Sequence, residues 1–248
     1  MPPLPRLCAS FQRLSECIWD DLEAATRATL QRDEETITND LLLDLWRLHP
    51  SDVIIVQFNK PQEARTGADW LWTLTDGTTW FSMLVQAKRL YQKTERYEKL
   101  GHSVGNPPRD QIDILINTAG HLRVSPAYVF YNFTNAQPLA PRVHWNCGSF
   151  PRTDRLFGCS VAEASAVKSM LSSADDRLSS ISAVSFPFHC LVCCPVRGPS
   201  LPITAHGVLS TSKRFVLPTT DPGDASSADG LTSSAPWWVR MVMELTPE

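Results

Sequence analysis

The sequence lacks a long apolar run, a glycine-rich phosphate-binding loop, an internal repeat and a strong charge of one sign. No stretch approaches the roughly 18 consecutive apolar residues of a membrane-spanning helix. The N-terminal sequence MPPLPRLCAS also lacks the apolar segment of a signal peptide. These absences predict a protein with no membrane partner.

Net charge and cysteine content restrict the possible partners and the cellular compartment of the protein. A formal net charge of −3 over 248 residues gives the whole chain no attraction to nucleic acid, so any nucleic-acid contact requires a local basic patch. Seven cysteines, an odd number spread along the chain, argue against a disulfide framework and for a reducing cytoplasm. With 43% hydrophobic and 20% charged residues, the composition is that of an ordinary soluble globular protein, here expected to be cytoplasmic.

The most informative stretch is GADWLWTLTDGTTWFSMLVQAK, residues 67–88. It predicts two strands joined by a turn at an Asp-Gly dipeptide. Side chains two apart in a strand share a face, so Gln86 and Lys88 project together, and Asp69 falls opposite them if the hairpin register allows. A carboxylate, an amide oxygen and an ammonium group would then converge. Such a set can hold a hard divalent cation and stabilise charge on a phosphate.

This spacing resembles the motif of the PD-(D/E)xK nuclease superfamily, which has the restriction-endonuclease-like fold. In that superfamily an Asp begins one strand and an acidic-x-Lys sequence ends the next. Here the two halves are Asp69 and Gln86-Ala87-Lys88, so a glutamine replaces the acidic residue, a departure that other branches share.

The sequence is more similar to an uncharacterised bacterial family that carries Glu-Thr-Ile-Thr, Thr-Gly-Ala-Asp-Trp and Gln-Ala-Lys-Arg-Leu. In this chain the three motifs begin at Glu35, Thr66 and Gln86. The likeness covers about residues 10–170, and it is specific through the combination of motifs rather than through any one of them.

The resemblance implies metal-dependent hydrolysis of phosphodiester bonds. Asp69, Gln86 and Glu35 would hold Mg²⁺ or Mn²⁺, and Lys88 would orient the attacking water or neutralise charge on the phosphate. The expected catalytic residues are therefore Glu35, Asp69, Gln86 and Lys88. Because Gln86 is neutral, the metal should bind more weakly than it would beside a carboxylate at that position.

The helix that supplies the glutamate is predicted over residues 34–48, with a buried stripe of Ile37, Leu41, Leu45 and Leu48. Glu34 and Glu35 both lie in its first turn, where carboxylates also favour the helix dipole without any catalytic role. Periodicity does not separate them. Glu35 is preferred because it opens the Glu-Thr-Ile-Thr match.

After the motif the chain becomes basic, with Arg89, Lys93 and Arg96 interleaved with tyrosines. This composition suits phosphate contacts with aromatic support and makes these three residues the candidate nucleic-acid contacts. Interspersed glutamates leave a second interpretation open, in which the segment is a solvated helix face with ion pairs. The loop at residues 101–108 can act as a flap over the site.

The remaining elements complete the expected fold class, an α/β restriction-endonuclease-like mixed central sheet flanked by helices with a C-terminal β-rich extension. The expected elements are helices at 14–30, 109–120 and from Ser160 to 171, strands at 52–58, 127–133 and 237–245, and loops at 1–10, 59–66 and 218–235. The nuclease core would span residues 1–172, and residues 173–248 would pack on it as an extension.

A group of His189, Cys190, Cys193 and Cys194 lies in an apolar run at 186–196. A CxxC beside a histidine invites a zinc interpretation, but a second ligand pair is missing. Buried reduced cysteines in a strand are the preferred interpretation.

We therefore expect a Mg²⁺-dependent endonuclease acting on nucleic acid, most plausibly DNA, that could serve in defence against foreign DNA and could work as a homodimer. Two alternatives remain open. One is a nucleic-acid-binding module of the same fold that has lost catalysis. The other is a structural or interaction protein in which Asp69 and Lys88 form a buried ion pair, so that no divalent ion stabilises the fold.

Overall fold

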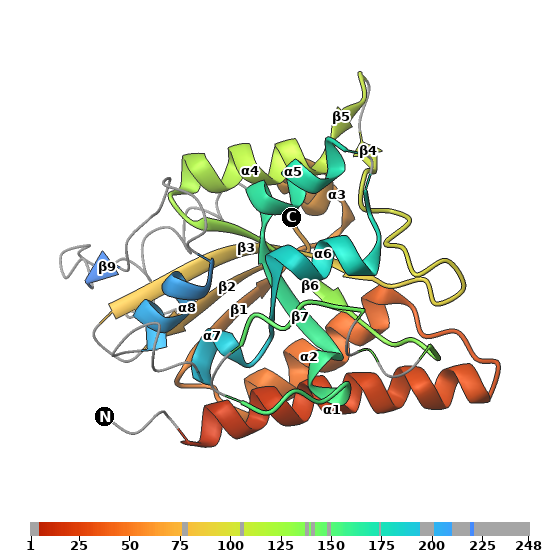
Figure 1. Cartoon of the computed structure of the whole chain (residues 1–248). Coiled ribbons are helices and arrows are strands. Elements are labelled where there is room, and N and C mark those ends of the chain that lie inside the picture. The colour runs from red at the N-terminus through yellow and green to blue at the C-terminus, as the bar shows by residue number, and fades with distance from the viewer. Residues whose placement is uncertain are drawn as a thin grey trace.

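The structure is a computed structural model that describes residues 5–75, 79–104, 107–136, 139, 142–147, 150–173, 175–193, 201–209 and 219–220. Its centre is a mixed sheet with helices on both sides (Figure 1). This architecture confirms the predicted α/β class with a mixed central sheet flanked by helices. None of the described helices has the length and apolar character of a membrane span.

The strand order in the sheet is β1-β2-β3-β6-β7-β8. The strands are β1 (Val53–Gln57), β2 (Trp70–Thr75), β3 (Thr79–Arg89), β6 (Ser125–Tyr131), β7 (Cys159–Glu163) and β8 (Ser185–Pro187), and β9 (Thr219–Thr220) pairs with the start of β3. The pairing of β3 with β6 is parallel, whereas the other pairs along this path are antiparallel. The parallel pair requires a crossover, which α4 (Gln111–Leu122) supplies.

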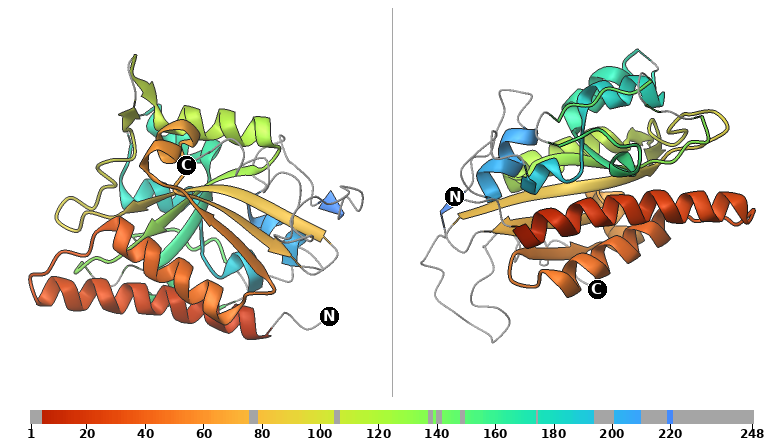
Figure 2. Two further views of the ribbon diagram at one scale, coloured as in Figure 1. Left: turned by 180° about the vertical axis from the view of Figure 1, so that it is seen from behind. Right: turned by 60° about the horizontal axis from the view of Figure 1, so that its bottom comes forward.

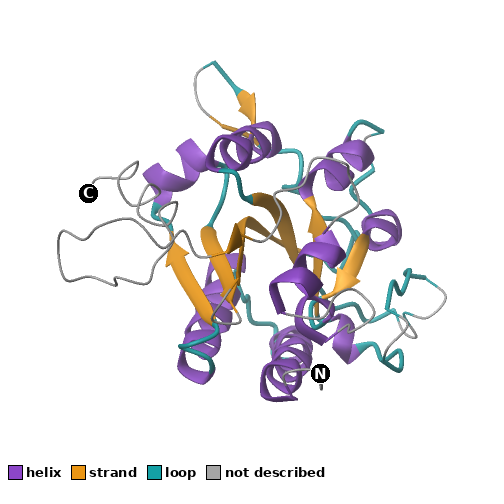
Figure 3. Cartoon of the chain, turned by 90° about the vertical axis from the view of Figure 1, so that its left-hand side faces the viewer, coloured by secondary structure: helices purple, strands orange, loops and turns teal. Residues whose placement is uncertain are grey.

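Helices α1 (Pro5–Arg27) and α2 (Glu34–Leu48) lie on one side of the sheet, and α4 and α5 (Ala164–Leu171) lie on the other (Figures 1 and 2). Seen from the side, the sheet runs between these two helical layers (Figure 3). Because both faces are covered, β2 is buried at every position. A strand buried on both faces carries large apolar side chains on each of them, as the consecutive residues Trp70, Leu71 and Trp72 do.

Three aromatic residues of the hairpin belong to the core. Trp70 and Trp72 are 0% and 1% exposed, and Trp80 is 8% exposed. Trp72 stacks with Phe11 of α1 and with Phe188, at ring-centroid distances of 5.6 and 5.5 Å. Each such ring stabilises the fold by several kcal/mol, on the order of the 3–5 kcal/mol lost when a buried aromatic is truncated.

Several boundaries differ from the sequence prediction. Helix α1 begins at Pro5, because Leu7 and Phe11 continue the apolar face toward the N-terminus and are buried. Residues 60–66 are not a loop but form α3 (Lys60–Thr66). A capping box between Asn59 and Gln62 stabilises the N-terminus of this helix. The Ser160 capping signature does not start a helix: residues 159–163 form β7, and Glu163 caps α5 by accepting from Ala166 N.

The described residues of the C-terminal part are mostly helical. They form α6 (Leu178–Val184), β8, α7 (Cys190–Cys193), α8 (Leu201–Leu209) and β9. The apolar run at 186–196 was expected to be a strand, but its middle forms the short helix α7. The expected loop at 218–235 falls almost wholly outside the described residues, and the expected strand at 237–245 falls entirely outside them.

The chain between β3 and α4 folds without a regular helix through residues 90–102, so the helical interpretation of the basic segment is wrong. The expected flap region contains β4 (Ser103–Val104) and β5 (Arg109–Asp110), which pair with each other. A single 3-10 turn, η1 (Arg155–Phe157), precedes β7.

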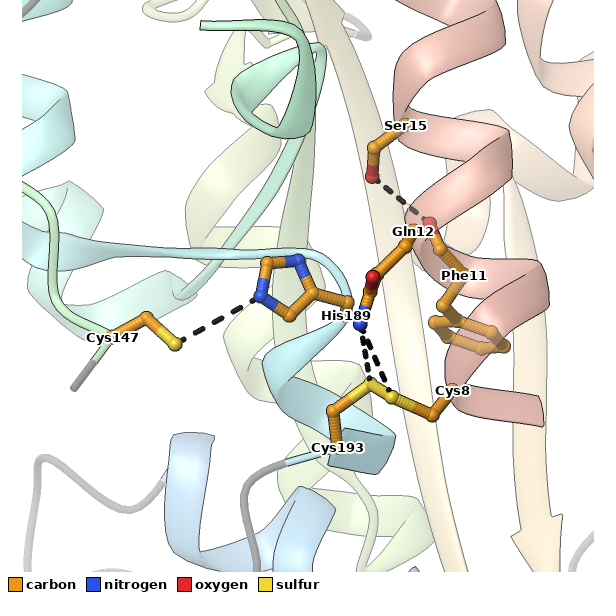
Figure 4. Close-up of a disulfide and its surroundings, with 7 residues drawn as sticks. All are labelled: Cys8, Phe11, Gln12, Ser15, Cys147, His189 and Cys193. Carbon is orange, nitrogen blue, oxygen red and sulfur yellow. Dashed lines mark hydrogen bonds between the residues drawn. A yellow bond between two sulfur atoms is a disulfide. The ribbon is translucent and has the colours of Figure 1, made fainter. Parts of the chain in front are cut away.

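Two cysteines that were expected to be reduced form a disulfide. Cys8 of α1 and Cys193 of α7 are bonded, with their Cα atoms 5.1 Å apart (Figure 4). The bond joins positions 185 residues apart in the sequence, a pairing that no spacing pattern could predict. Among the described cysteines, Cys17 and Cys159 are free.

Candidate metal and phosphate site

Asp69 stands at the entrance to β2, where α3 ends. Gly67 closes α3 in the left-handed conformation at φ 72° and passes so close to α4 that an added Cβ would lie 2.5 Å from Leu115 N. Only glycine suits such a position. The backbone of Asp69 then joins the sheet, its N–H donating to Val85 O at 2.8 Å.

The hairpin register brings Asp69 to Gln86, as the sequence predicts. Trp70 pairs with Val85 in the antiparallel ladder. Asp69, which precedes Trp70, therefore lies opposite Gln86, which follows Val85. Asp69 Oδ2 accepts from Ala87 N at 2.6 Å and from Gln86 Nε2 at 2.9 Å. The carboxylate is therefore fixed against the end of β3.

The charge state of Asp69 is unusual. Burial raises the pKa of Asp69 to about 7, even though the Lys88 ammonium and the Ala87 N–H both lower it. The nearby carboxylates of Glu34 and Glu63 raise this pKa further. A carboxyl group with a pKa shifted by burial and by like charges is typical of sites that bind a cation or move a proton.

Gln86 holds an oxygen that has no protein partner. The side chain is 2% exposed, and its Nε2 is used by Asp69, whereas Oε1 is buried without a hydrogen-bond partner among the described residues. An unpaired buried amide oxygen costs on the order of 1–3 kcal/mol. A cation beside Oε1 would remove that cost.

Lys88 lies two residues further along β3 and is also buried, at 6% exposure. Its Nζ lies 3.4 Å from Glu34 Oε1, and the other carboxylate oxygen of Glu34 accepts from Arg89 N at 2.8 Å. Glu34 thus links the first turn of α2 to the end of β3. The ion pair expected between Lys88 and Asp69 in the structural alternative is instead formed with Glu34.

The structure brings Glu34, rather than Glu35, to this site. Glu35 is exposed and pairs with Lys60 at 3.4 Å on the surface. Adjacent helical residues point about 100° apart, so only one of the two glutamates can face the sheet. A signal for Glu34 was present, because its positions i+3, i+4 and i+7 are Ile37, Thr38 and Leu41, all of which are buried.

The three predicted nucleic-acid contacts have different surroundings. Arg89 donates to Arg32 O at 2.6 Å and lies 5.3 Å from the Tyr91 ring centroid, so its guanidinium is held in place. Arg96 is engaged with Asp176. Lys93 is exposed and has no ion-pair partner in the part of the chain that the structure describes. Of the three, Lys93 is the residue most available to a phosphate.

The donor atoms fit a hard divalent cation. Asp69 and Glu34 offer carboxylate oxygens, and Gln86 offers the unpaired amide oxygen. Mg²⁺ binds few protein oxygens and keeps several waters, so this set suffices. The buried Lys88 ammonium adds a positive charge for an anionic ligand next to the same oxygens.

The chain belongs to the family of unknown function DUF6615, whose pattern it matches over residues 7–247. No curated protein matches the sequence.

Proposed function

We propose that this member of DUF6615 is a divalent-metal-dependent nuclease of the PD-(D/E)xK type, with Asp69, Gln86, Lys88 and Glu34 as its active site. The observation that carries the proposal is the meeting of these four side chains at one end of the β2–β3 hairpin. They come from three elements and include a carboxyl with a pKa of about 7, an unpaired amide oxygen and a buried ammonium group.

The placement agrees with the motif that the sequence resembles. Asp69 immediately precedes one strand, Gln86-Ala87-Lys88 lies at the end of the next, and Glu34 lies on a helix N-terminal to both. A hairpin chosen only for stability has no need to bury a lysine and an unpaired amide oxygen beside an aspartate, because each carries a desolvation cost.

The residues divide the work as follows. Asp69, Glu34 and the Oε1 atom of Gln86 would hold the divalent ion, which would supply positive charge and a water of lowered pKa. Lys88 faces the same oxygens and stabilises the extra negative charge that develops on the phosphate during attack. Glu34 also orients Lys88 and the Arg89 backbone, so it couples metal binding to phosphate binding.

Because Gln86 is neutral, Glu34 must supply the second negative charge of the proposed metal site. A neutral ligand weakens metal affinity, and the second carboxylate then becomes essential rather than supplementary. DNA is the proposed substrate class, with Lys93 contacting phosphate outside the active site.

The test is incubation of the purified chain with supercoiled, linear and single-stranded DNA in Mg²⁺, in Mn²⁺ and in EDTA. Wild type should cleave in metal and not in EDTA, and both Asp69→Ala and Lys88→Ala should abolish cleavage. Asp20→Ala is the matched control, because the Asp20 side chain is 45% exposed and pairs with Arg155 rather than with a residue of the site.

The glutamine favours one alternative, a binding module that keeps the site but not the reaction. A folded wild-type protein that shifts DNA in a gel and leaves it intact in every metal would establish that alternative. A protein that neither cleaves nor binds DNA would refute both.

A further inference from the structure

We propose a second metal site, for Zn²⁺ or a similarly thiophilic ion, formed by Cys147, His189 and Cys190. Within the described residues these are the one group of three histidine, cysteine or acidic side chains whose ligand atoms all lie within 4.8 Å of one another. The sequence suggested a zinc interpretation for the His-Cys pair but offered no further ligand. The fold supplies it from a segment 42 residues earlier.

The distances suit a tetrahedral ion. Cys147 Sγ lies 3.8 Å from His189 Nε2 (Figure 4). With Zn–S of about 2.3 Å and Zn–N of about 2.0–2.1 Å, tetrahedral angles place sulfur and nitrogen ligands roughly 3.6 Å apart. The Cys147–His189 pair therefore already has nearly the required separation. The outer limit of 4.8 Å for the group asks for a closure of about one ångström at most.

The burial of the three side chains also supports a bound metal ion. His189 and Cys190 are both 0% exposed, and Cys147 is 7% exposed. His189 Nδ1 is buried without a hydrogen-bond partner among the described residues, and its other nitrogen has only the sulfur contact. An imidazole buried with so little hydrogen bonding is costly, and a metal–nitrogen bond would repay that cost.

The backbone around the three ligands is fixed before any ion binds. The Asn146 amide donates to the carbonyls of Ser182, Ala183 and Ser185, which secures the loop carrying Cys147 against β8. On the other side, Phe188 N donates to Cys159 O, so the turn that carries His189 is attached to β7. Such attachment lowers the ordering cost of binding.

The ligand types select the metal. Two thiolates and an imidazole favour Zn²⁺ and disfavour Mg²⁺, which prefers oxygen. Binding would release the thiol protons and join the loop at 142–147 to β8 and α7 through one ion. Cys193 lies one turn beyond Cys190 but is bonded to Cys8, and so it is not part of the proposed set.

The test is metal analysis of the full chain, followed by Co²⁺ titration of the metal-free protein. One equivalent of zinc is expected, and Co²⁺ should give the visible bands of a tetrahedral site together with thiolate-to-cobalt charge transfer. Cys147→Ser and His189→Asn should each lower the affinity by at least 10-fold. Cys159→Ser, a buried thiol outside the group, and Cys17→Ser should keep full metal content.

The Co²⁺ spectrum of wild type decides the matter even if a variant fails to fold. A folded wild-type protein that binds no stoichiometric zinc and shows no charge-transfer band would overturn the proposal. So would metal that persists in Cys147→Ser and is lost in Cys193→Ser, because the ligands would then be the CxxC pair. Neither outcome affects the nuclease proposal, because metal binding at that site is measured through DNA cleavage.

Discussion

The molecule holds two buried polar groups of opposite chemistry. At the end of the β2–β3 hairpin, oxygen ligands and an ammonium group come from residues that are mostly close in the sequence. Near α7, thiols and an imidazole come from a loop and a turn 42 residues apart. The first group has oxygen donors and a buried ammonium group, which is the combination that the proposed phosphate chemistry requires. The second has thiol and imidazole donors, which suit a thiophilic ion such as Zn²⁺.

The largest expected effect is that a substitution in one group abolishes the function of that group and leaves the other group unaffected. Asp69→Ala should abolish DNA cleavage and leave zinc content unchanged, whereas Cys147→Ser should remove zinc and leave the cleavage rate of the folded protein near wild type. Cleavage measured with and without added Zn²⁺ on both variants checks this. Loss of both properties in either variant would show that the groups are one coupled site.

A comparison of two neighbouring glutamates tests whether Glu34, rather than Glu35, belongs to the first group. Glu34→Gln should slow cleavage by more than the roughly 10–100-fold that loss of a group outside the ligand shell costs, because Glu34 is itself a proposed metal ligand. Glu35→Gln should stay within about twofold of wild type, because that carboxylate pairs with Lys60 on the surface. Equal losses in the two variants, measured as single-turnover rates, would contradict the arrangement.

The protonation of Asp69 predicts a pH-dependent stability. Its pKa is about 7 in the folded chain and near 3.8 when unfolded, so the folded state binds an extra proton between these values. Wild type should therefore lose stability as pH rises from about 4 to 7, on the order of 4 kcal/mol, and stay at that lower level above pH 7. Asp69→Asn should remove this loss.

Urea unfolding of both proteins at pH 5 and pH 8 measures the difference. The Asn variant should gain on wild type mainly at pH 8, and excess Mg²⁺ or Mn²⁺ should stabilise only wild type there. The same gain at both pH values would show that Asp69 is not titrating as described.

The smallest effect concerns the surface. Lys93→Ala should weaken DNA binding less than about tenfold and reduce the dependence of log K on log salt by about one unit. Arg96→Ala should change stability rather than DNA affinity, because Arg96 is engaged with Asp176. Gel-shift titrations at several salt concentrations distinguish the two, and an Arg96 effect on the salt slope would reverse the assignment.

Local pattern explains why the oxygen group was largely predictable. The two-residue period and the turn signal place Asp69, Gln86 and Lys88 together through one hairpin, and that information lies within about twenty residues of sequence. The choice between Glu34 and Glu35 depends on the rotation of α2 against the sheet. The sequence favoured Glu35 through its motif match, whereas the structure places Glu34 beside Lys88, in agreement with the buried positions Ile37 and Leu41.

Long-range contacts explain what the sequence could not show. The Cys8–Cys193 bond and the approach of Cys147 to His189 depend on how α1, α7 and the loop before β7 pack on the sheet. Helix α3 was missed for a local reason, since a short polar stretch with proline reads as a loop unless the Asn59–Gln62 capping box is recognised.

The most direct test of the central claim compares wild type with Lys88→Ala on supercoiled DNA in Mg²⁺, with thermal unfolding of both proteins measured in the same buffers. The account predicts metal-dependent cleavage by wild type, no cleavage by Lys88→Ala, and stabilisation of both by the ion, because Lys88 acts on phosphate while Asp69, Gln86 and Glu34 hold the metal. Intact DNA with the folded wild type, or a cleavage rate that Lys88→Ala leaves unchanged, would contradict it.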